Sequence, residues 1–345
     1  MDMFDTRTML AMLDEPKSAN TFLKDRYFSN VRAFDTAKID IDIRKGKRRI
    51  APFVHPKIGG KTVEHLGYRT ETFEAPEVSP DMITTAEDML KRMAGEGITG
   101  SMSPDERAAE QLGRDMGELD ELITRREEAM CAEALFKGQV TVSGEGYDEQ
   151  VIQFWPAAAG DQPYTALAAG ARWDEATSDP MANFRTYRRK VIQSSGVTPQ
   201  DAILGTDAIE ALLSNTSFSS KLDSRRIDMG AIDPQNLPNG VTYWGYLKDS
   251  GLDLWSYDEW YIDEDSGLEV PMVPAKSVLL GSPNARTTMA YGCVVDVDKG
   301  SFALPRVPVS WTQRKNPAGR VVQMKSKPLP IINQVDGFYV LDVLA

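Results

Sequence analysis

One long amphipathic helix constrains this chain more than any other feature. Ser103-Pro-Asp-Glu106 has the pattern of a capping box with proline at the first helical position, which predicts a helix start. Apolar residues then recur at helical spacing and form a single stripe: Leu112, Met116, Leu119, Ile123, Met130 and Ala134. Gly138 predicts the end, so the helix is on the order of 50 Å long. Gly113 and Gly117 lower its stability without any local reason.

The segment before this helix is expected to form an arm and a charged hairpin. Residues 1–37 are predicted to be an arm with a short helix over 5–13. Residues 38–44 alternate between charged and apolar side chains, the period of a strand. A second extended stretch, 61–73, would complete a long two-stranded hairpin. A lone hairpin is marginal in water, so this one is expected to reach another surface.

Charge is distributed unevenly along the 345 residues. The chain has 51 acidic and 39 basic residues and a formal net charge of −12. Residues 38–69 carry nine basic and three acidic side chains, whereas residues 249–269 carry eight acidic and no basic side chains. An acidic chain is repelled by nucleic acid, so a nucleic-acid-binding module is disfavoured.

The second half of the chain mixes helices and strands. Strands are predicted over 139–143 and 150–155, on either side of a turn. Residues 178–215 are expected to be helical around Thr198-Pro-Gln-Asp201 and Thr206-Asp207. Strands are predicted to dominate from Thr242 onward, including a hairpin that turns at Asp265-Ser-Gly267. This order indicates an α+β protein.

Few residues are available for catalysis or metal binding. Cys131 and Cys293 are too far apart in sequence to form a metal cluster or disulfide framework. The two histidines, His55 and His65, almost exclude histidine-based catalysis. The sequence contains neither a G-x-S-x-G nor an H-E-x-x-H motif. We therefore predict no catalytic residue, no cofactor and no metal ion.

Three short motifs have ordinary structural explanations. Gly95-Glu-Gly-Ile-Thr-Gly100 matches a dinucleotide-binding loop, but the expected preceding segment is a helix instead of a strand, which favours a linker. Asp263-Glu-Asp-Ser-Gly267 resembles a calcium loop, but Leu268 takes the position that requires glycine, so a hairpin turn is favoured. Lys45-Gly-Lys-Arg-Arg49 could bind phosphate, but a charged edge or an inter-subunit contact fits better.

Nothing in the sequence predicts a membrane location. The first seven residues lack the basic and apolar regions of a secretory signal. No apolar run approaches the length that a transmembrane helix needs. A cytoplasmic protein is expected, and a cytoplasmic enzyme of unassigned chemistry remains an alternative function.

Several segments, in the same order and at similar spacing, resemble the lambda-type phage major capsid proteins, the capsid protein E family. The similar segments are Met3–Leu10, Thr21–Phe28, Ala134–Gly144, Lys221–Arg226, Val278–Arg286, Tyr291–Cys293, Ser326–Ile332 and Val340–Ala345. Together they extend almost from one end of the chain to the other. The resemblance implies an HK-97-like fold.

The resemblance also implies a division of the chain into the parts of that fold. Residues 1–37 would be the N-terminal arm and 38–80 the extended E-loop hairpin. Residues 81–185 would form the peripheral domain, with the spine helix at 103–137. Residues 186–296 would form the axial domain. Residues 297–345 would return to the peripheral domain, except for the last strand, which would join the axial domain.

The implied function is structural. Many copies would form hexamers and pentamers that close into an icosahedral shell around packaged double-stranded DNA. The chain would be assembled in the host cytoplasm and end in the virion. Scaffolding, portal and decoration proteins would be its other partners, and DNA would be enclosed without sequence-specific binding.

The charge pattern suggests how neighbouring copies meet. Identical chains in a ring make heterologous contacts, in which one patch meets a different patch. The expected E-loop contact residues are Arg44, Lys45, Lys47, Arg48, Arg49 and Phe53. The expected acidic partner residues on the neighbouring copy are Asp258, Glu259, Asp263, Glu264 and Asp265.

Overall fold

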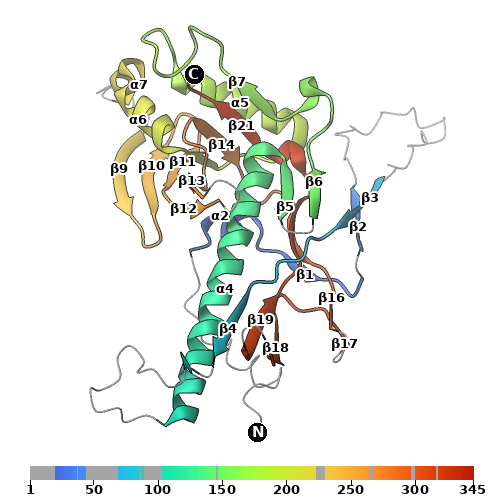
Figure 1. Cartoon of the computed structure of the whole chain (residues 1–345). Helices are drawn as coiled ribbons and strands as arrows, with labels where there is room; N and C mark the ends of the chain where they lie inside the picture. The colour runs from blue at the N-terminus through green and yellow to red at the C-terminus, as the bar shows by residue number, and fades with distance from the viewer. Residues whose placement is uncertain are drawn as a thin grey trace, which may run out of the picture.

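A long helix joins two sheets that lie at opposite ends of the molecule (Figure 1). This computed structural model describes residues 20–36, 38–43, 69–85, 87–88, 103–144, 147–222, 230–263, 267–296, 300–315 and 318–345. The helix expected over residues 5–13 lies outside these ranges.

The long helix, α4, runs from Pro104 to Lys137, as the sequence predicts. Ser103 forms the N-cap, and the capping box with Glu106 is complete: Ser103 Oγ accepts from the Glu106 amide, and Glu106 accepts from the Ser103 amide. At the other end Gly138 adopts φ 67°, in the left-handed region that favours glycine. A Cβ at Gly138 would also lie 2.0 Å from the Trp155 ring, so no other residue fits there.

The N-terminal half of α4 packs on a small antiparallel sheet. This sheet has the strand order β18-β19-β4. Its strands are β4 (Asp81–Thr85), β18 (Val307–Gln313) and β19 (Gly319–Lys325). The predicted stripe faces it: Leu112, Met116, Leu119 and Ile123 are buried against Val322 and Met324. The stripe prediction is therefore confirmed.

The C-terminal half of α4 packs beside a seven-stranded mixed sheet. The strand order is β7-β21-β14-β8-β11-β10-β9. The strands are β7 (Tyr164–Ala166), β8 (Asp201–Leu204), β9 (Gly230–Asn236), β10 (Val241–Leu247), β11 (Leu252–Tyr257), β14 (Ser277–Gly281) and β21 (Tyr339–Asp342). Helices α5 (Pro180–Ser195), α6 (Thr206–Ser214) and α7 (Thr216–Leu222) contribute buried side chains to the core on the other face of this sheet.

Strand β8 corrects one prediction, because the sequence around Thr198–Asp201 was expected to be helical. Its four residues are all buried. Ala202 and Leu204 face the core shared with α5–α7, whereas Ile203 faces the core shared with α4. A strand that is covered on both faces lacks the alternation of polar and apolar residues by which strands are recognised.

Shorter strands complete the fold. The first are β1 (Val31–Ala33), β2 (Lys38–Ile43), β3 (Arg69–Glu74), β5 (Gln139–Gly144) and β6 (Tyr147–Gln153). The others are β12 (Trp260–Ile262), β13 (Glu269–Pro271), β15 (Thr287–Tyr291), β16 (Val294–Asp296), β17 (Gly300–Phe302) and β20 (Pro328–Ile332). Two 3-10 turns lie at Ala159–Asp161 and Val335–Gly337. The antiparallel pairs β5–β6 and β12–β13 confirm the predicted hairpins.

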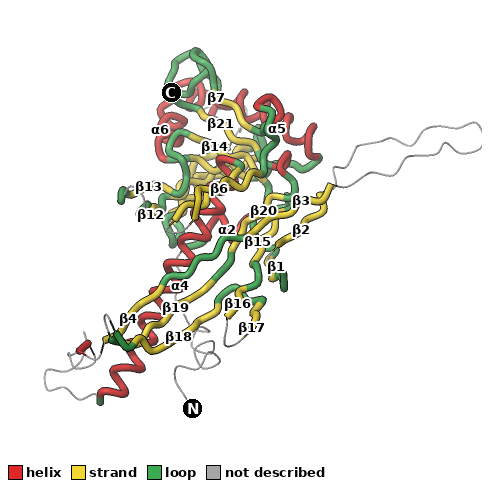
Figure 2. Tube along the Cα trace, turned by 45° about the vertical axis from the view of Figure 1, so that its right-hand side comes forward, coloured by secondary structure: helices red, strands yellow, loops and turns green. Residues whose placement is uncertain are grey.

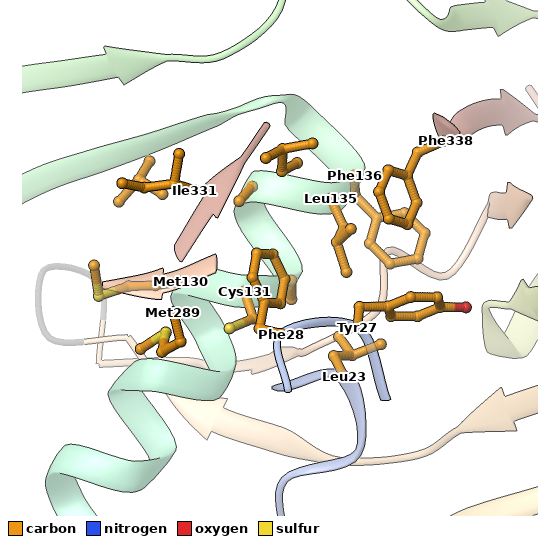
Figure 3. Close-up of a cluster of buried hydrophobic side chains, with 14 of the residues drawn as sticks. Leu23, Tyr27, Phe28, Met130, Cys131, Leu135, Phe136, Met289, Ile331 and Phe338 are labelled. Carbon is orange, nitrogen blue, oxygen red and sulfur yellow. The ribbon is translucent and has the colours of Figure 1, made fainter. Parts of the chain in front are cut away.

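The arm contributes to the main core. Helix α2 (Phe22–Tyr27) packs against the C-terminal half of α4, and β1 pairs in parallel with β15. Leu23, Tyr27 and Phe28 are almost completely buried, next to Cys131 and Leu135 of α4 (Figure 3). Aromatic anchors in this segment are evident from the sequence, but the surface that they pack against is not. In the described part of the chain, no helix is both long and apolar enough to cross a membrane.

Candidate assembly surfaces

The charged hairpin leaves the body of the molecule on one side. Strands β2 and β3 pair antiparallel, with Lys38 opposite Glu74 and Ile43 opposite Arg69. Ile39 and Phe73 are buried at its base, and the Phe73 ring lies 5.7 Å from that of Phe154. The predicted contact residues lie outside the described part of the chain: Arg44, Lys45, Lys47, Arg48, Arg49 and Phe53.

The acidic hairpin β12–β13 lies on the other side of α4 (Figures 1 and 2). Of the predicted acidic partners, Asp258, Glu259 and Asp263 are described, whereas Glu264 and Asp265 lie outside the described residues. Asp258 and Glu259 directly precede β12 and are partly exposed. Burial raises the pKa of Asp258 above its ordinary value.

A groove of about 660 Å³ separates this hairpin from α4. One wall belongs to α4 and carries positive charge. The other belongs to the hairpin and carries negative charge. The α4 wall consists of Leu122, Arg125, Arg126 and Ala129. The hairpin wall consists of Asp258, Glu259, Trp260, Tyr261, Ile262 and Glu269.

Apolar side chains are exposed around the groove. Trp260 is 48% exposed, Ile262 67% and Leu122 43%. Tyr261 lies between the two exposed β12 residues. It packs instead against the hydrophobic core that contains Cys131 and Leu135 of α4. Of the groove residues, Asp258 and Glu259 are predicted from the sequence as acidic partners. The apolar ones are not predicted, although the alternation of Trp260, Tyr261 and Ile262 is the signal of a strand with one exposed face. Clusters of exposed large apolar residues are typical of interaction surfaces.

On its other side, α4 carries two adjacent carboxylates that are completely buried. Glu127 accepts from Lys24 Nζ at 2.7 Å and from Arg306 Nη1 at 2.5 Å. Arg306 also donates to Asp120 of α4, at 2.7 Å. Burial alone would raise the pKa of Glu127, but the charges of Arg306 and Lys24 hold it below its ordinary value.

The second carboxylate, Glu128, binds the backbone of the arm. Its two oxygens accept from the amides of Leu23, at 2.6 Å, and Lys24, at 3.0 Å. Burial raises the pKa of Glu128 to about 7, and the two amide hydrogen bonds oppose that rise.

A third buried carboxylate ties the arm to the seven-stranded sheet. Asp201, the first residue of β8, accepts from Arg26 Nε at 2.8 Å and from Arg26 Nη2 at 2.5 Å. The Tyr27 hydroxyl donates to the same carboxylate at 3.2 Å, and the Arg26 guanidinium lies 4.5 Å from the Trp255 ring centroid. Helix α2 thus joins α4 to the sheet. No sequence pattern predicts this network of buried carboxylates.

Side chains suited to metal binding do not gather in the described residues. No group of three histidine, cysteine or carboxylate side chains there could hold a metal ion. Cys131 and Cys293 are free and buried, and burial raises the pKa of the Cys131 thiol. His55 and His65 lie outside the described residues.

Comparison with known proteins gives the class of the fold. A crystal structure of a putative capsid protein of a prophage from E. coli CFT073 superimposes with a TM-score of 0.73 at 21% identity, covering 99% of both chains. The fold is therefore that of a phage capsid protein, the HK-97-like α+β fold that the resemblance implies.

Sequence comparison identifies the family. The model of the phage major capsid protein E family matches residues 5–343, so the chain belongs to this family. The chain is 24% identical to the major capsid protein of Escherichia phage N15 over 343 residues, covering 98% of both. It is 23% identical to the major capsid protein of Escherichia phage lambda over 346 residues, again covering 98% of both. The chain is thus a structural protein of a phage head.

Proposed function

We propose that copies of this chain assemble as hexamers and pentamers into an icosahedral shell that encloses packaged double-stranded DNA. The observation that carries the proposal is the match of the capsid family over nearly the whole chain, together with the capsid fold. The chain acts as a structural subunit without catalytic activity. The alternative function is that of a cytoplasmic enzyme of unassigned chemistry. Assembly takes place in the host cytoplasm.

The parts of the HK-97-like fold correspond to stretches of this chain. We assign residues 1–37 to the arm, 38–80 to the E-loop, 81–185 to the peripheral domain and 186–296 to the axial domain. Residues 297–345 return to the peripheral domain and end in the axial domain. Strands β18 and β19 beside β4, and β21 beside β14, support this assignment.

Neighbouring copies meet through the basic E-loop of one and the acidic hairpin β12–β13 of the next. The hairpins β2–β3 and β12–β13 lie on opposite sides of α4 (Figures 1 and 2), so the same contact can repeat from copy to copy around a ring. The basic residues 44–49 complement Asp258, Glu259 and Glu269. Phe53 complements the exposed Trp260 and Ile262. Each exposed ion pair contributes only about 0–1 kcal/mol, so charge mainly guides docking and register.

Electron microscopy of the purified full-length chain tests the function. Closed shells or rings of five and six subunits are expected. Single particles of subunit size at every protein concentration, salt concentration and pH would contradict the proposal. Scaffolding, portal and decoration proteins are proposed as further partners. Their addition to the assembly reaction is expected to change shell size, uniformity or stability.

A further inference from the structure

The face of α4 opposite the buried stripe carries a hollow of about 460 Å³ beside Gly113 and Gly117, called here the glycine hollow. We propose that the glycine hollow is a docking site, in which the E-loop of a second copy lies with its backbone against these two glycines. The inference rests on the proposed function and deepens it, because it adds α4 itself to the surface that receives the E-loop at the β12–β13 hairpin.

The space in the hollow is not used by the described part of the subunit. All described residues that line it belong to α4. Apart from the adjoining helix backbone, a Cβ at Gly113 or Gly117 would meet no described atom within 4 Å. Glycine inside a helix lowers its stability relative to alanine, but it allows another backbone to approach closely. The two glycines therefore leave room for a chain that comes from outside the subunit.

The glycine hollow continues into the groove beneath the β12–β13 hairpin. Leu122 and Arg125 line both, so the two form one continuous depression along α4. Between Gly113 at one end and Ala129 at the other, this depression follows the helix for about 24 Å. A segment that docks on the hairpin can therefore extend along α4 to the two glycines.

The E-loop is long enough to occupy the whole depression. Residues 44–68 connect β2 to β3 at the far end of the charged hairpin. If half of these residues run outward and half return, they extend about 40 Å beyond Ile43 at about 3.3 Å per residue. This length exceeds the distance along α4 between Gly113 and Ala129.

The charges of the depression complement those of the E-loop. Its two parts are lined by five carboxylates and three arginines. Glu118 and Glu121 are the carboxylates of the glycine hollow, where the charge of Arg114 is balanced by Glu110 at 2.5 Å. Residues 44–68 carry seven basic side chains and one acidic side chain, whereas the whole chain has a net charge of −12. Electrostatic complementarity therefore favours the E-loop over the acidic remainder of a neighbouring copy.

Substitution of Gly117 separates this docking from the stability of the subunit. Gly117→Gln fills the hollow with a side chain that favours a helix, so the Tm of the unassembled chain should stay the same or rise by about 1 °C. The rate of shell assembly, followed by light scattering at low salt, should fall by about tenfold or more, because the new side chain blocks the approach of the E-loop. Gly117→Ala should cause a smaller fall.

A matched control tests whether the position matters. Gly160, in the 3-10 turn Ala159–Asp161, also has no described atom within 4 Å of an added Cβ. Gly160→Gln therefore adds the same side chain to an equally open glycine outside α4, and it should assemble at the parental rate.

Cross-linking of wild-type shells identifies what lies in the hollow. A carbodiimide joins carboxylates to lysine amines in contact with them. Shells assembled from a mixture of ¹⁵N-labelled and unlabelled copies distinguish links between copies from links within one copy. We expect mass spectrometry to find links from Glu118 or Glu121 of one copy to a lysine within residues 44–68 of another.

The outcomes distinguish this docking from the proposed function. A wild-type chain that never forms shells or rings would remove both. If the wild type forms shells and Gly117→Gln forms them equally fast, the docking alone is wrong. An equal loss of assembly in Gly160→Gln would also overturn it. So would a lower Tm of Gly117→Gln, or the absence of links between copies from Glu118 and Glu121, because either result would mean that a different segment fills the hollow.

Discussion

The two sides of α4 differ in how deeply their charged side chains are buried. On one side of α4, Glu127 and Glu128 are buried, and each of their contacts is made inside the chain. On the other side, Arg125 and Arg126 line a groove opposite the carboxylates of the β12–β13 hairpin. Separating a buried charge from its partner costs much free energy, so the buried pairs hold the elements of the subunit together. Partly exposed charges cost little in the single chain and remain available to a neighbour.

This comparison predicts that equal changes on the two sides of α4 have unequal effects. The largest difference in unfolding free energy is expected between the variants Leu119→Asp and Leu122→Asp. Leu119 is completely buried in the stripe, so aspartate there would place an unpaired charge in the core and cost several kcal/mol of unfolding free energy. Leu122 is 43% exposed, and its replacement should cost less than about 1 kcal/mol.

Chemical denaturation of both variants measures the difference. Equal stabilities would show that the two positions are equally exposed and would contradict the placement of the stripe on β19. Shell assembly provides a second test, because Leu119→Asp should give little soluble protein able to assemble.

The next largest effect is expected for the buried arginine of the network. Arg306→Met removes a partner from Glu127 and Asp120 and should cost about 3 kcal/mol, because a buried carboxylate loses its cation. The same substitution in the groove, Arg125→Met, should change the unfolding free energy by less than about 0.5 kcal/mol. Thermal unfolding at pH 7 checks both. A similar small loss in the two variants would show that the buried network contributes no more than surface charge.

A change confined to assembly is expected for the basic hairpin. Arg48→Glu with Arg49→Glu should slow or stop shell formation at low salt and leave the unfolding free energy unchanged, because charge guides docking between copies. Light scattering follows the assembly rate. Combination with Asp258→Lys and Glu259→Lys should restore part of that rate. Assembly of the first double variant at the parental rate would mean that the hairpin charges do not bind a neighbour.

The smallest effect on stability is expected for the apolar rim of the groove. Trp260→Ser should alter the unfolding free energy by less than about 0.5 kcal/mol, because the ring is nearly half exposed. Assembly should weaken if a neighbouring copy covers this ring. Trp311, 40% exposed on β18, is the matched control, and Trp311→Ser should leave the hairpin contact intact. If both variants assemble like the parent, the groove is not an interface between copies.

The sequence alone determined the elements whose signals are local. Ser103, Glu106 and Gly138 set the ends of α4 through contacts within a few residues, and the 3.6-residue spacing of the stripe identified its buried face. The strict alternation after Lys38 likewise predicted the base of the charged hairpin. The order of similar segments along the chain was enough to identify the family.

The tertiary structure decided what depends on residues far apart in the chain. Glu128 and Leu23 are 105 positions apart, and Arg26 and Asp201 are 175 positions apart. No local pattern distinguishes these carboxylates from the exposed acids of the same chain, because burial is decided by which elements pack around them. The same reason explains β8, whose two buried faces belong to different cores. It also explains the groove, where residues of α4 and β12 become neighbours only in the folded chain.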